Sequence, residues 1–304
     1  MKIAYLIDKE AIGGGGEYIR RKIAALPDGD EGRAFYADRG ECTWKALREW
    51  GAEKVVINHL RAAVQLFNPL RGGVRARRIT TVFVVHGIHL RKFDWLPKTI
   101  ANRVKRELRR RLESWIYHRC DRVVALTETD RNDILKLYGN DLNVIVEPNT
   151  LEGWVEARVA RAVLSTAVAT DREVREGEFK YICIGRFDFQ KGQDRWIRGV
   201  SEKVKVKSEK VGRTLFIGDG PTLAGCKQLA NDLDVEELFE FAGAIPDADR
   251  YLKCADIVVS PSRWEGMPYL LMKARALGCQ VLATDCPGNR DVLGGYDRWE
   301  KLEL

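Results

Sequence analysis

The sequence predicts an α/β protein built from two domains with parallel sheets. Short apolar runs alternate with longer amphipathic segments through both halves of the chain, whereas residues 151–179 contain no clear strand. Such alternation favours parallel sheets covered by helices. A length of 304 residues also suits two domains better than one. We therefore expect domains over residues 1–150 and 180–304, joined by a partly helical connection over 151–179.

The first half contains five predicted strands with helices between them. The apolar runs lie near residues 2–7, 54–58, 80–85, 122–126 and 143–147. Four glycines, residues 13–16, follow the first run and precede a helix. Glycine lets the backbone approach a ligand closely and leaves N–H groups free for a phosphate. From the glycines alone, a phosphate-binding loop at Gly14 and Gly15 and a flexible turn both stay open.

The run at 80–85 delivers a histidine to the end of a predicted strand. His86 follows Val85 directly, and His89 comes three residues later. An imidazole in this position can hydrogen-bond a ligand, and we favour that role for His86 over a structural one. The His89 side chain either packs within the domain or faces a second substrate. His59 could end another strand near His86.

Basic residues are concentrated in the first half. Residues 1–150 carry 28 Lys and Arg against 19 Asp and Glu, whereas the remainder carries 23 against 25. Much of the excess lies in 71–78 and 98–112. In the second segment apolar residues recur at every fourth position, which predicts a helix with one stripe facing the core: Ile100, Val104, Leu108, Leu112 and Ile116. The basic residues then form a solvated surface or attract anionic lipid headgroups.

In the second half, short apolar strands end in turns that carry charge. Residues 181–184 lead into Gly185 and Arg186, and Lys191 follows five residues after Arg186. A second strand closes in a Gly-Asp-Gly-Pro turn at 218–221. A third, at 239–241, leads towards Ala244 and Ile245. Fixed cations such as Arg186 and Lys191 would bind an anionic ligand at the ends of these strands.

The most informative segment is residues 257–278. An apolar strand at 257–259 gives way to a loop that carries Glu265, and Pro268 suits the first turn of the next helix. A helix start there directs N–H groups and a partial positive charge at a ligand beside Glu265. Lys273 lies eight residues after Glu265, on the same predicted helix.

These motifs, in this order over roughly residues 180–295, resemble the family-four retaining glycosyltransferases, also called glycosyl transferases group 1. The resemblance implies the GT-B fold, in which two Rossmann-like domains with parallel sheets face each other across a cleft. It also implies transfer of a sugar, with retention, from a nucleotide-diphosphate donor to a hydroxyl of a glycan or lipid-linked acceptor. Cell-envelope, lipopolysaccharide or exopolysaccharide synthesis is the expected setting.

The resemblance assigns roles to single residues. Glu265 and His86 are the expected catalytic residues. The other expected contacts with the donor are the diphosphate with Arg186, Lys191, Gly14 and Gly15, the sugar with Gly266, Met267 and Pro268, and the nucleoside with Ala244, Ile245 and Lys273. We expect no metal ion, because no Asp-x-Asp cation site stands where one would be needed, and no cofactor besides the nucleotide sugar itself.

Lys273 departs from the family pattern, in which a second Glu at this position accepts hydrogen bonds from the ribose. An ammonium group only donates. Lys273 therefore donates to ribose oxygens or to a phosphate, or the donor is unusual, or the protein binds sugar nucleotides or glycans without transferring them. A buried, uncompensated Lys is costly, so we expect its side chain to be exposed or paired. Family members usually continue with further helices, so we expect either a truncated chain or an abbreviated second domain.

Composition limits the class and location of the protein. Hydrophobic residues at 45% and charged residues at 31% are typical of a soluble globular chain, and no apolar run reaches the roughly 18 residues that span a bilayer. Seven scattered Cys argue against a zinc site or a disulfide framework. We expect a cytoplasmic protein that contacts the inner face of the plasma membrane peripherally through Lys98–Arg111. Nucleic acid is a competing partner favoured by charge alone, because no recognition motif accompanies the basic segment.

Overall fold

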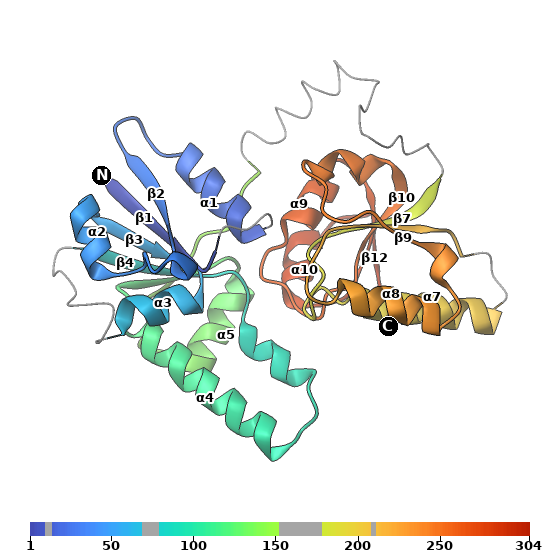
Figure 1. Ribbon diagram of the computed structural model, residues 1–304, viewed down its shortest axis with the longest axis horizontal. Coiled ribbons are helices and arrows are strands. Elements are labelled where there is room, and N and C mark those ends of the chain that lie inside the picture. The colour runs from blue at the N-terminus through green and yellow to red at the C-terminus, as the bar shows by residue number, and fades with distance from the viewer. Residues whose placement is uncertain (10–13, 69–78, 152–177, 208–210) are drawn as a thin grey trace. The chain divides into compact units, whose positions relative to one another are not determined.

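The computed structural model describes residues 1–9, 14–68, 79–151, 178–207 and 211–304. Most of the predicted connection at 151–179 and the basic run at 71–78 lie outside the described residues. Contacts divide the chain into two compact units, Met1–Asn149 and Thr150–Leu304 (Figure 1). Each unit is described by itself.

The first unit is a six-stranded parallel sheet in the order β2-β1-β3-β4-β5-β6. Its strands are β1 (Lys2–Ile7), β2 (Glu31–Tyr36), β3 (Lys54–Ile57), β4 (Thr80–Val85), β5 (Arg122–Ala125) and β6 (Val144–Val146). Its helices are α1 (Gly14–Ala24), η1 (Ala37–Arg39), α2 (Trp44–Trp50), α3 (Leu60–Phe67), η2 (His89–Asp94), α4 (Ile100–Tyr117) and α5 (Glu128–Tyr138). In Figure 1, α1 lies on one side of the sheet and α3, α4 and α5 lie on the other.

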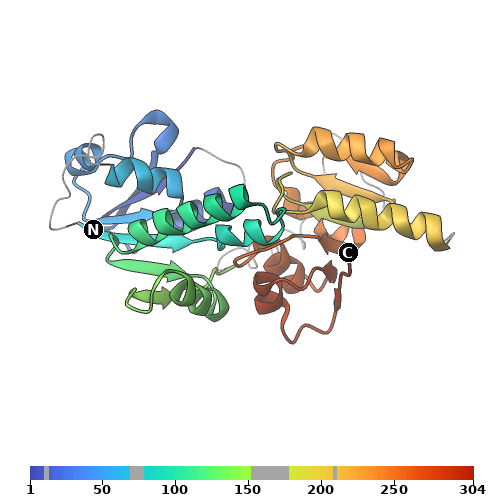
Figure 2. The same ribbon diagram turned by 90° about the horizontal axis from the view of Figure 1, so that it is seen from below.

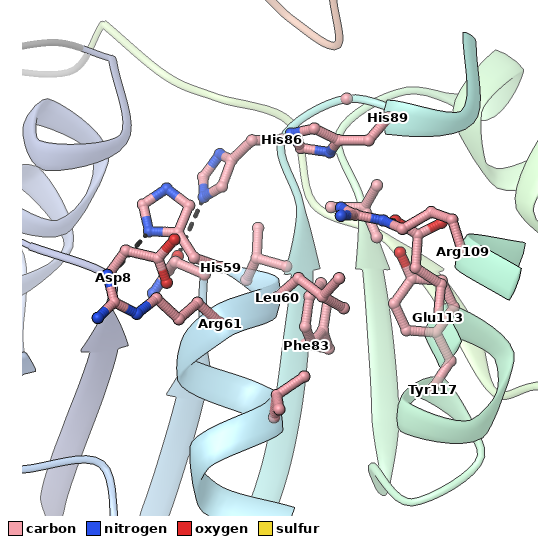
Figure 3. Close-up of a pocket in the computed structure, with 15 residues that line it drawn as sticks. Asp8, His59, Leu60, Arg61, Phe83, His86, His89, Arg109, Glu113 and Tyr117 are labelled. Carbon is pink, nitrogen blue, oxygen red and sulfur yellow. Dashed lines mark hydrogen bonds and ion pairs between the residues drawn. The ribbon is translucent and has the colours of Figure 1, made fainter. Parts of the chain in front are cut away.

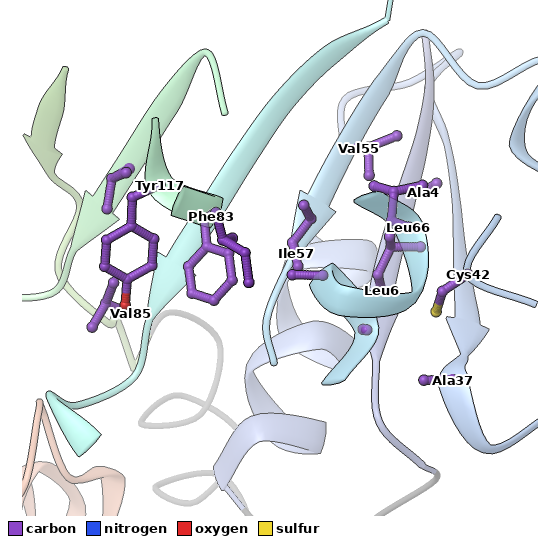
Figure 4. Close-up of a cluster of buried hydrophobic side chains, with 14 of the residues drawn as sticks. Ala4, Leu6, Ala37, Cys42, Val55, Ile57, Leu66, Phe83, Val85 and Tyr117 are labelled. Atoms are coloured by element: carbon purple, nitrogen blue, oxygen red, sulfur yellow. The ribbon is translucent and has the colours of Figure 1, made fainter. Parts of the chain in front are cut away.

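Both faces of this sheet are buried: alternate residues of each strand point to opposite sides, and consecutive residues of β1 and β4 are buried. Leu6 of β1 and Phe83 of β4 belong to a core cluster that also contains residues of α2, α3, α4 and α5 (Figure 4). Their neighbours in sequence, Tyr5 and Val84, are equally buried but lie outside that cluster. Near-continuous apolar runs are what a parallel sheet covered on both faces requires.

The sequence predicts five of these six strands and misses β2. β2 pairs only with β1, at the edge of the sheet. Its residues Glu31 to Arg33 are exposed or half-buried, so the strand lacks the apolar run that marks the others. Charged residues are common on edge strands, where they discourage pairing with other chains.

α4 forms at the predicted place, but the prediction that its apolar stripe faces the core is wrong. Ile100, Val104 and Leu108 are 79%, 52% and 62% exposed, whereas Ile116 is fully buried. At 3.6 residues per turn, a row of every fourth residue drifts around the helix by about 40° per step. The row therefore winds from the solvent side to the core. The inner side of α4 carries the buried Glu113 instead.

The second unit is also a six-stranded parallel sheet, in the order β12-β11-β10-β7-β8-β9. Its strands are β7 (Phe179–Ile184), β8 (Thr214–Ile217), β9 (Phe239–Phe241), β10 (Ala255–Ser260), β11 (Gln280–Ala283) and β12 (Trp299–Lys301). Its helices are α7 (Gln193–Lys207), α8 (Leu223–Asp232), η3 (Glu236–Leu238), η4 (Ala248–Lys253), α9 (Tyr269–Ala276) and α10 (Pro287–Leu293). One core cluster joins the sheet to α9 and α10, and another joins it to α7 and α8.

In both sheets the chain reverses direction beside its first strand. The second unit runs from β7 through β8 to β9, and β10 then pairs with the other side of β7. In open parallel sheets, loops at such a reversal separate and form ligand sites at the carboxyl ends of the strands. The loop after β7 carries Arg186 and Lys191, and the loop after β10 carries Glu265. The predicted charged residues thus follow the two strands that flank the reversal.

Candidate functional site

Glu265 is buried and paired with Lys191. Lys191 Nζ lies 2.6 Å from Glu265 Oε1, and only 5% of Glu265 is exposed. The Ser262 hydroxyl donates to the same carboxylate oxygen at 2.7 Å. Burial alone would lower the pKa of Lys191, but the adjacent carboxylate outweighs this effect and raises it. A charged Lys191–Glu265 pair therefore joins the two loops at the chain reversal.

Further contacts fix these two loops against each other. Arg263 binds both carboxylate oxygens of Asp194, at the start of α7, with distances of 2.8 and 2.6 Å. Its guanidinium also lies over the ring of Phe189, 4.0 Å from the centroid. The Gln190 side chain donates to the Trp264 carbonyl at 3.0 Å. This network holds the charged pair in place before any ligand arrives, which is the arrangement that favours catalysis.

Two glycines let backbone pass close to backbone around the pair. Gly192 has a φ of +68°, and a Cβ there would collide with the Pro261 carbonyl oxygen. A Cβ on Gly288, at the start of α10, would lie 2.7 Å from the Glu265 carbonyl group and closer still to the Gly266 carbonyl oxygen. The sequence alone assigns a role to neither position. Their only signal was a glycine next to the first turn of a helix.

Arg186 follows β7 with its side chain 59% exposed. Its Nε lies 3.8 Å from Asp188 Oδ2, which is a loose ion pair. The next residue, Phe187, donates its N–H to the Asp219 carbonyl at 2.9 Å and so ties this loop to the turn after β8. The backbone of Arg186 is therefore held while its guanidinium can still turn towards an anion.

The loop after β9 carries the predicted nucleoside contacts, Ala244 and Ile245. Just before them, the Gly243 carbonyl accepts a hydrogen bond from the Gly218 N–H at 2.7 Å. Ile245 packs against the core cluster shared with α9. The loops after β7, β8 and β9 are thus linked through their backbones at the same edge of the sheet.

The predicted sugar contacts lie between Glu265 and α9. Gly266 is buried and Met267 half-buried, and Pro268 is the N-cap of α9 rather than a residue of its first turn. Proline brings no side-chain hydrogen bond to the cap. The start of α9 therefore leaves the N–H groups of its first turn directed at the loop.

Lys273 is buried and paired, which confirms one of the two expected environments. Its side chain is 4% exposed, and Nζ lies 2.8 Å from Asp249 Oδ2 in η4. The ammonium also lies 5.8 Å from the centroid of the Tyr269 ring. Asp249 therefore supplies the compensating charge from within the chain.

A cavity of about 490 Å³ opens in the first unit, at the ends of β3 and β4 (Figure 3). His59, His86 and His89 all line it. His86 Nε2 lies 3.0 Å from Asn58 Oδ1, and Tyr18 packs edge-on against its ring. Burial, followed by the nearby imidazoles of His59 and His89, lowers the pKa of His86 to about 3. The ring is therefore neutral at pH 7, and one of its nitrogens contacts Asn58.

The other wall of the cavity is formed by α4. Glu113 is buried there, and its Oε1 accepts a hydrogen bond from Arg109 Nε at 2.6 Å. The Tyr138 hydroxyl donates to Glu113 Oε2 at 2.5 Å. In Figure 3, Arg109 and Glu113 lie side by side across the cavity from Arg61. The sequence alone assigns no site role to Arg109 or Glu113, and their spacing of four residues on a basic helix was the available signal.

Gly14 and Gly15 begin α1, and residues 10–13 before them lie outside the described residues. Their contact with a diphosphate stays a prediction, as do the roles of the other predicted site residues. In the described part of the chain, no group of three or more His, Cys, Asp or Glu side chains is arranged to hold a metal ion.

Two family models match the chain, one in each unit. The model described as "Glycosyltransferase Family 4" matches residues 8–150, and that described as "Glycosyl transferases group 1" matches residues 178–299. Both halves of the chain therefore match the same kind of protein.

The chain is similar to longer curated proteins. It is 30% identical over 123 residues to an uncharacterized glycosyltransferase of Methanocaldococcus jannaschii, covering 40% of this chain and 30% of that protein. It is 24% identical over 224 residues to the UDP-Gal:alpha-D-GlcNAc-diphosphoundecaprenol alpha-1,3-galactosyltransferase of Escherichia coli, covering 72% of this chain. That alignment spans 55% of the galactosyltransferase, so both relatives extend well beyond the matched region.

The fold is similar to that of solved glycosyltransferase structures. HepE of Anabaena, solved with UDP-glucose, matches with a TM-score of 0.68 at 14% identity, covering 99% of this chain and 86% of HepE. The two parallel α/β units thus have the GT-B fold, as the sequence predicts. With a family model matched in each unit and this fold, the chain belongs to the group 1 glycosyltransferases of family four.

Proposed function

We propose that the protein is a retaining glycosyltransferase. It moves a sugar from a nucleotide-diphosphate donor to a hydroxyl of a glycan or lipid-linked acceptor. The Lys191–Glu265 pair carries this proposal, because it is fixed where the loops after β7 and β10 meet at the chain reversal. Arg186, on the same loop as Lys191, adds an exposed guanidinium.

These residues supply the charges that the reaction needs. Arg186 and Lys191 stabilise the negative charge that gathers on the departing diphosphate, so no metal ion is required for that task. The Glu265 carboxylate accepts hydrogen bonds from hydroxyls of the donor sugar. The neutral ring of His86 hydrogen-bonds a substrate hydroxyl at the cavity of the first unit. With retention, the new bond forms on the face that the diphosphate leaves.

The comparisons support the classes of donor and acceptor. The Escherichia coli relative is named for a UDP-galactose donor and a diphosphoundecaprenol-linked acceptor, and HepE was solved with UDP-glucose. A uridine diphosphate sugar and a lipid-linked glycan precursor are therefore the first substrates to test. Such an acceptor places the reaction at a membrane surface, where the basic segment Lys98–Arg111 would be attracted to anionic lipids.

Calorimetry with UDP, GDP, ADP and their sugar conjugates tests donor binding. We expect one nucleotide to bind saturably to the wild type and about tenfold or more weakly to Arg186→Ala, since a charge-assisted contact to phosphate is lost. Arg198→Ala, which removes an exposed guanidinium from α7, is the matched control and should bind like the wild type. Equal binding to all three proteins would contradict the assignment of Arg186.

Retention and metal independence need separate measurements. Proton NMR of the fresh product should show the same anomeric configuration as the donor sugar. The rate should be unchanged after chelation with EDTA. An inverted product, or a rate restored only by a divalent cation, would overturn the corresponding part of the proposal.

The Lys273–Asp249 pair favours a second candidate, a protein that binds sugar nucleotides or glycans without transferring the sugar. Lys273 stands where the family has a carboxylate, and its ammonium is engaged by Asp249. Saturable donor binding with neither transfer nor donor hydrolysis across a panel of lipid-linked acceptors would support this candidate. Turnover by the wild type would exclude it.

A further inference from the structure

The outward side of α4 is apolar along most of its length. We call the set Ile100, Val104, Leu108, Leu112 and Trp115 the α4 outer face. Its members are 79%, 52%, 62%, 37% and 37% exposed, in that order. Single exposed apolar residues are ordinary on a protein surface, but a contiguous row on one helix marks an interaction surface.

The first unit holds α4 chiefly from the side opposite the α4 outer face, and Trp115 also packs edge-on against Phe67 of α3. α4 is anchored from its other side, where Ile116 and Tyr117 enter the core cluster and Glu113 is buried. Figure 2, a view from below, shows α4 in front of the first sheet, with no described element of the first unit covering it from that direction. The most exposed residues of the row, Ile100, Val104 and Leu108, can therefore contact something outside the unit.

Basic residues flank the row, so a partner of this surface should carry negative charge. Arg103 and Lys105 are exposed beside it, and Lys98 lies just before the helix. None of these three forms an ion pair with another described residue, whereas Glu107 is already engaged by Arg110 and Arg111. A partner that accepts apolar side chains between basic flanks must be apolar inside and anionic at its surface. An anionic lipid bilayer has this layout.

Aromatic residues stand near both ends of the helix. Trp95 is 46% exposed before α4, and the Arg119 guanidinium lies 3.8 Å from the centroid of the Trp115 ring. Tryptophan and arginine place an apolar body in the acyl region and a polar end among the headgroups. Among the described helices none is long and apolar enough to cross a membrane. α4 therefore suits a position in the plane of the interface.

We propose that the α4 outer face inserts into the headgroup and acyl boundary of an anionic bilayer, with Arg103 and Lys105 at the lipid phosphates. Because Arg109 and Glu113 of the same helix line the cavity of the first unit, docking would bring that cavity to the membrane surface. The advantage of placing the cavity near a lipid-linked acceptor rests on the proposed function. The docking itself depends only on the surface of α4.

Vesicle sedimentation tests the proposal on the whole chain. The probes are phosphatidylcholine vesicles with and without phosphatidylglycerol. We expect the wild type to bind the anionic vesicles, and Ile100→Ser/Val104→Ser/Leu108→Ser to bind about tenfold or more weakly because the apolar contact is lost. Ile100→Leu/Val104→Leu/Leu108→Met keeps the row apolar and should bind like the wild type.

A charge pair of variants tests the basic flanks. Arg103→Gln/Lys105→Gln should weaken binding to the anionic vesicles, whereas Lys203→Gln/Lys205→Gln, which removes the same charge from α7, should not.

Brominated lipids should quench tryptophan fluorescence in the wild type and much less in Trp95→Phe/Trp115→Phe. Quenching that is equal in both proteins would place the contact elsewhere and overturn the proposal.

The other outcomes are also decisive. If the serine variant binds as tightly as the wild type and both are released by salt, adsorption is electrostatic only and insertion is excluded. If the wild type binds no vesicles and forms a dimer, whereas the serine variant is a monomer, the partner of the α4 outer face is a second copy of the chain. This outcome overturns the proposal. The serine variant should keep nucleotide binding in solution, so loss of docking is distinguishable from failure of the proposed donor site.

Discussion

Lys273 and Asp249 illustrate how a charge inside the second unit is tolerated. A buried charge is stable only when it is paired, and removing one partner of a buried pair leaves the other uncompensated. We expect Lys273→Met to lower the free energy of unfolding by about 2–3 kcal/mol, less than for a fully buried pair because the Asp249 side chain is 22% exposed. Urea denaturation measures this loss.

The double variant Lys273→Met/Asp249→Asn is the matched control for this pair. It removes both charges and should recover most of the lost stability, because replacing both partners is far less harmful than replacing one. A double variant as unstable as Lys273→Met would show that the pair is not the source of the effect.

His86 should make folding sensitive to acid. Its pKa is about 3 in the folded chain against an ordinary 6.5, so between these values the unfolded chain binds the proton and the folded chain does not. Stability is therefore fully present above about pH 6.5 and falls as pH declines through this window. We expect the free energy of unfolding to drop more between pH 7 and pH 5 in the wild type than in His86→Gln. Urea titrations at both pH values check this, and equal drops would contradict the lowered pKa.

Among the elements, the start of α10 controls the loop that carries Glu265. A Cβ on Gly288 would lie 2.7 Å from the Glu265 carbonyl group, so Gly288→Ala must displace the loop. We expect donor affinity to fall about tenfold or more and stability to fall by about 1–3 kcal/mol. Calorimetry and thermal unfolding measure the two effects.

Gly225→Ala is the matched control for this helix contact. Gly225 lies inside α8, and a Cβ there meets nothing within 4 Å. Because alanine favours a helix interior over glycine, this variant should gain about 0.5–1 kcal/mol and keep donor binding. Equal losses in both variants would show that the packing of Gly288 against the Glu265 loop is not responsible.

The sequence predicts the elements that can be recognised from their own local residue pattern. Buried parallel strands such as β4 and β10 read as apolar runs, so their positions are predictable. The edge strand β2 has no such apolar run, because it pairs with a single strand and most of its residues are exposed or half-buried. A four-residue repeat cannot place all five apolar residues of α4 on one side, because the row drifts by about 40° per step. Which part of the row turns inward depends on tertiary partners such as Tyr138, whose hydroxyl donates to Glu113.

The residues of the candidate site likewise fall into those that the sequence predicts and those that it does not. Glu265, Lys191 and Arg186 stand in local motifs, and the sequence therefore predicts them. The partner of Lys273 comes from 24 residues away along the chain, and the contact of Gly288 with the Glu265 loop depends on how α10 packs. Pairings of this kind arise from tertiary structure, and a single sequence does not contain them.

For the whole molecule, two parallel sheets predict a pattern of backbone protection. Central strands are paired on both sides and covered on both faces, so their N–H groups exchange only when a unit opens widely. We expect hydrogen exchange to be slowest in β1, β3 and β4 of the first unit and in β7, β8 and β10 of the second. Mass spectrometry of peptides should show faster exchange in the edge strands β2 and β12. Uniform exchange within a unit would contradict this ranking.

The short edges of the two sheets have a consequence for the behaviour of the chain before it is fully folded. β6, β9 and β12 each contain 3 residues, and the longer edge strand β2 begins with Glu31 and carries Arg33. An unpaired strand edge is a template on which another chain can add a strand, and three residues or a charged row offer a poor one. The parallel sheets, slow to assemble because their strands are distant in sequence, thus give neighbouring chains little to aggregate on while they form.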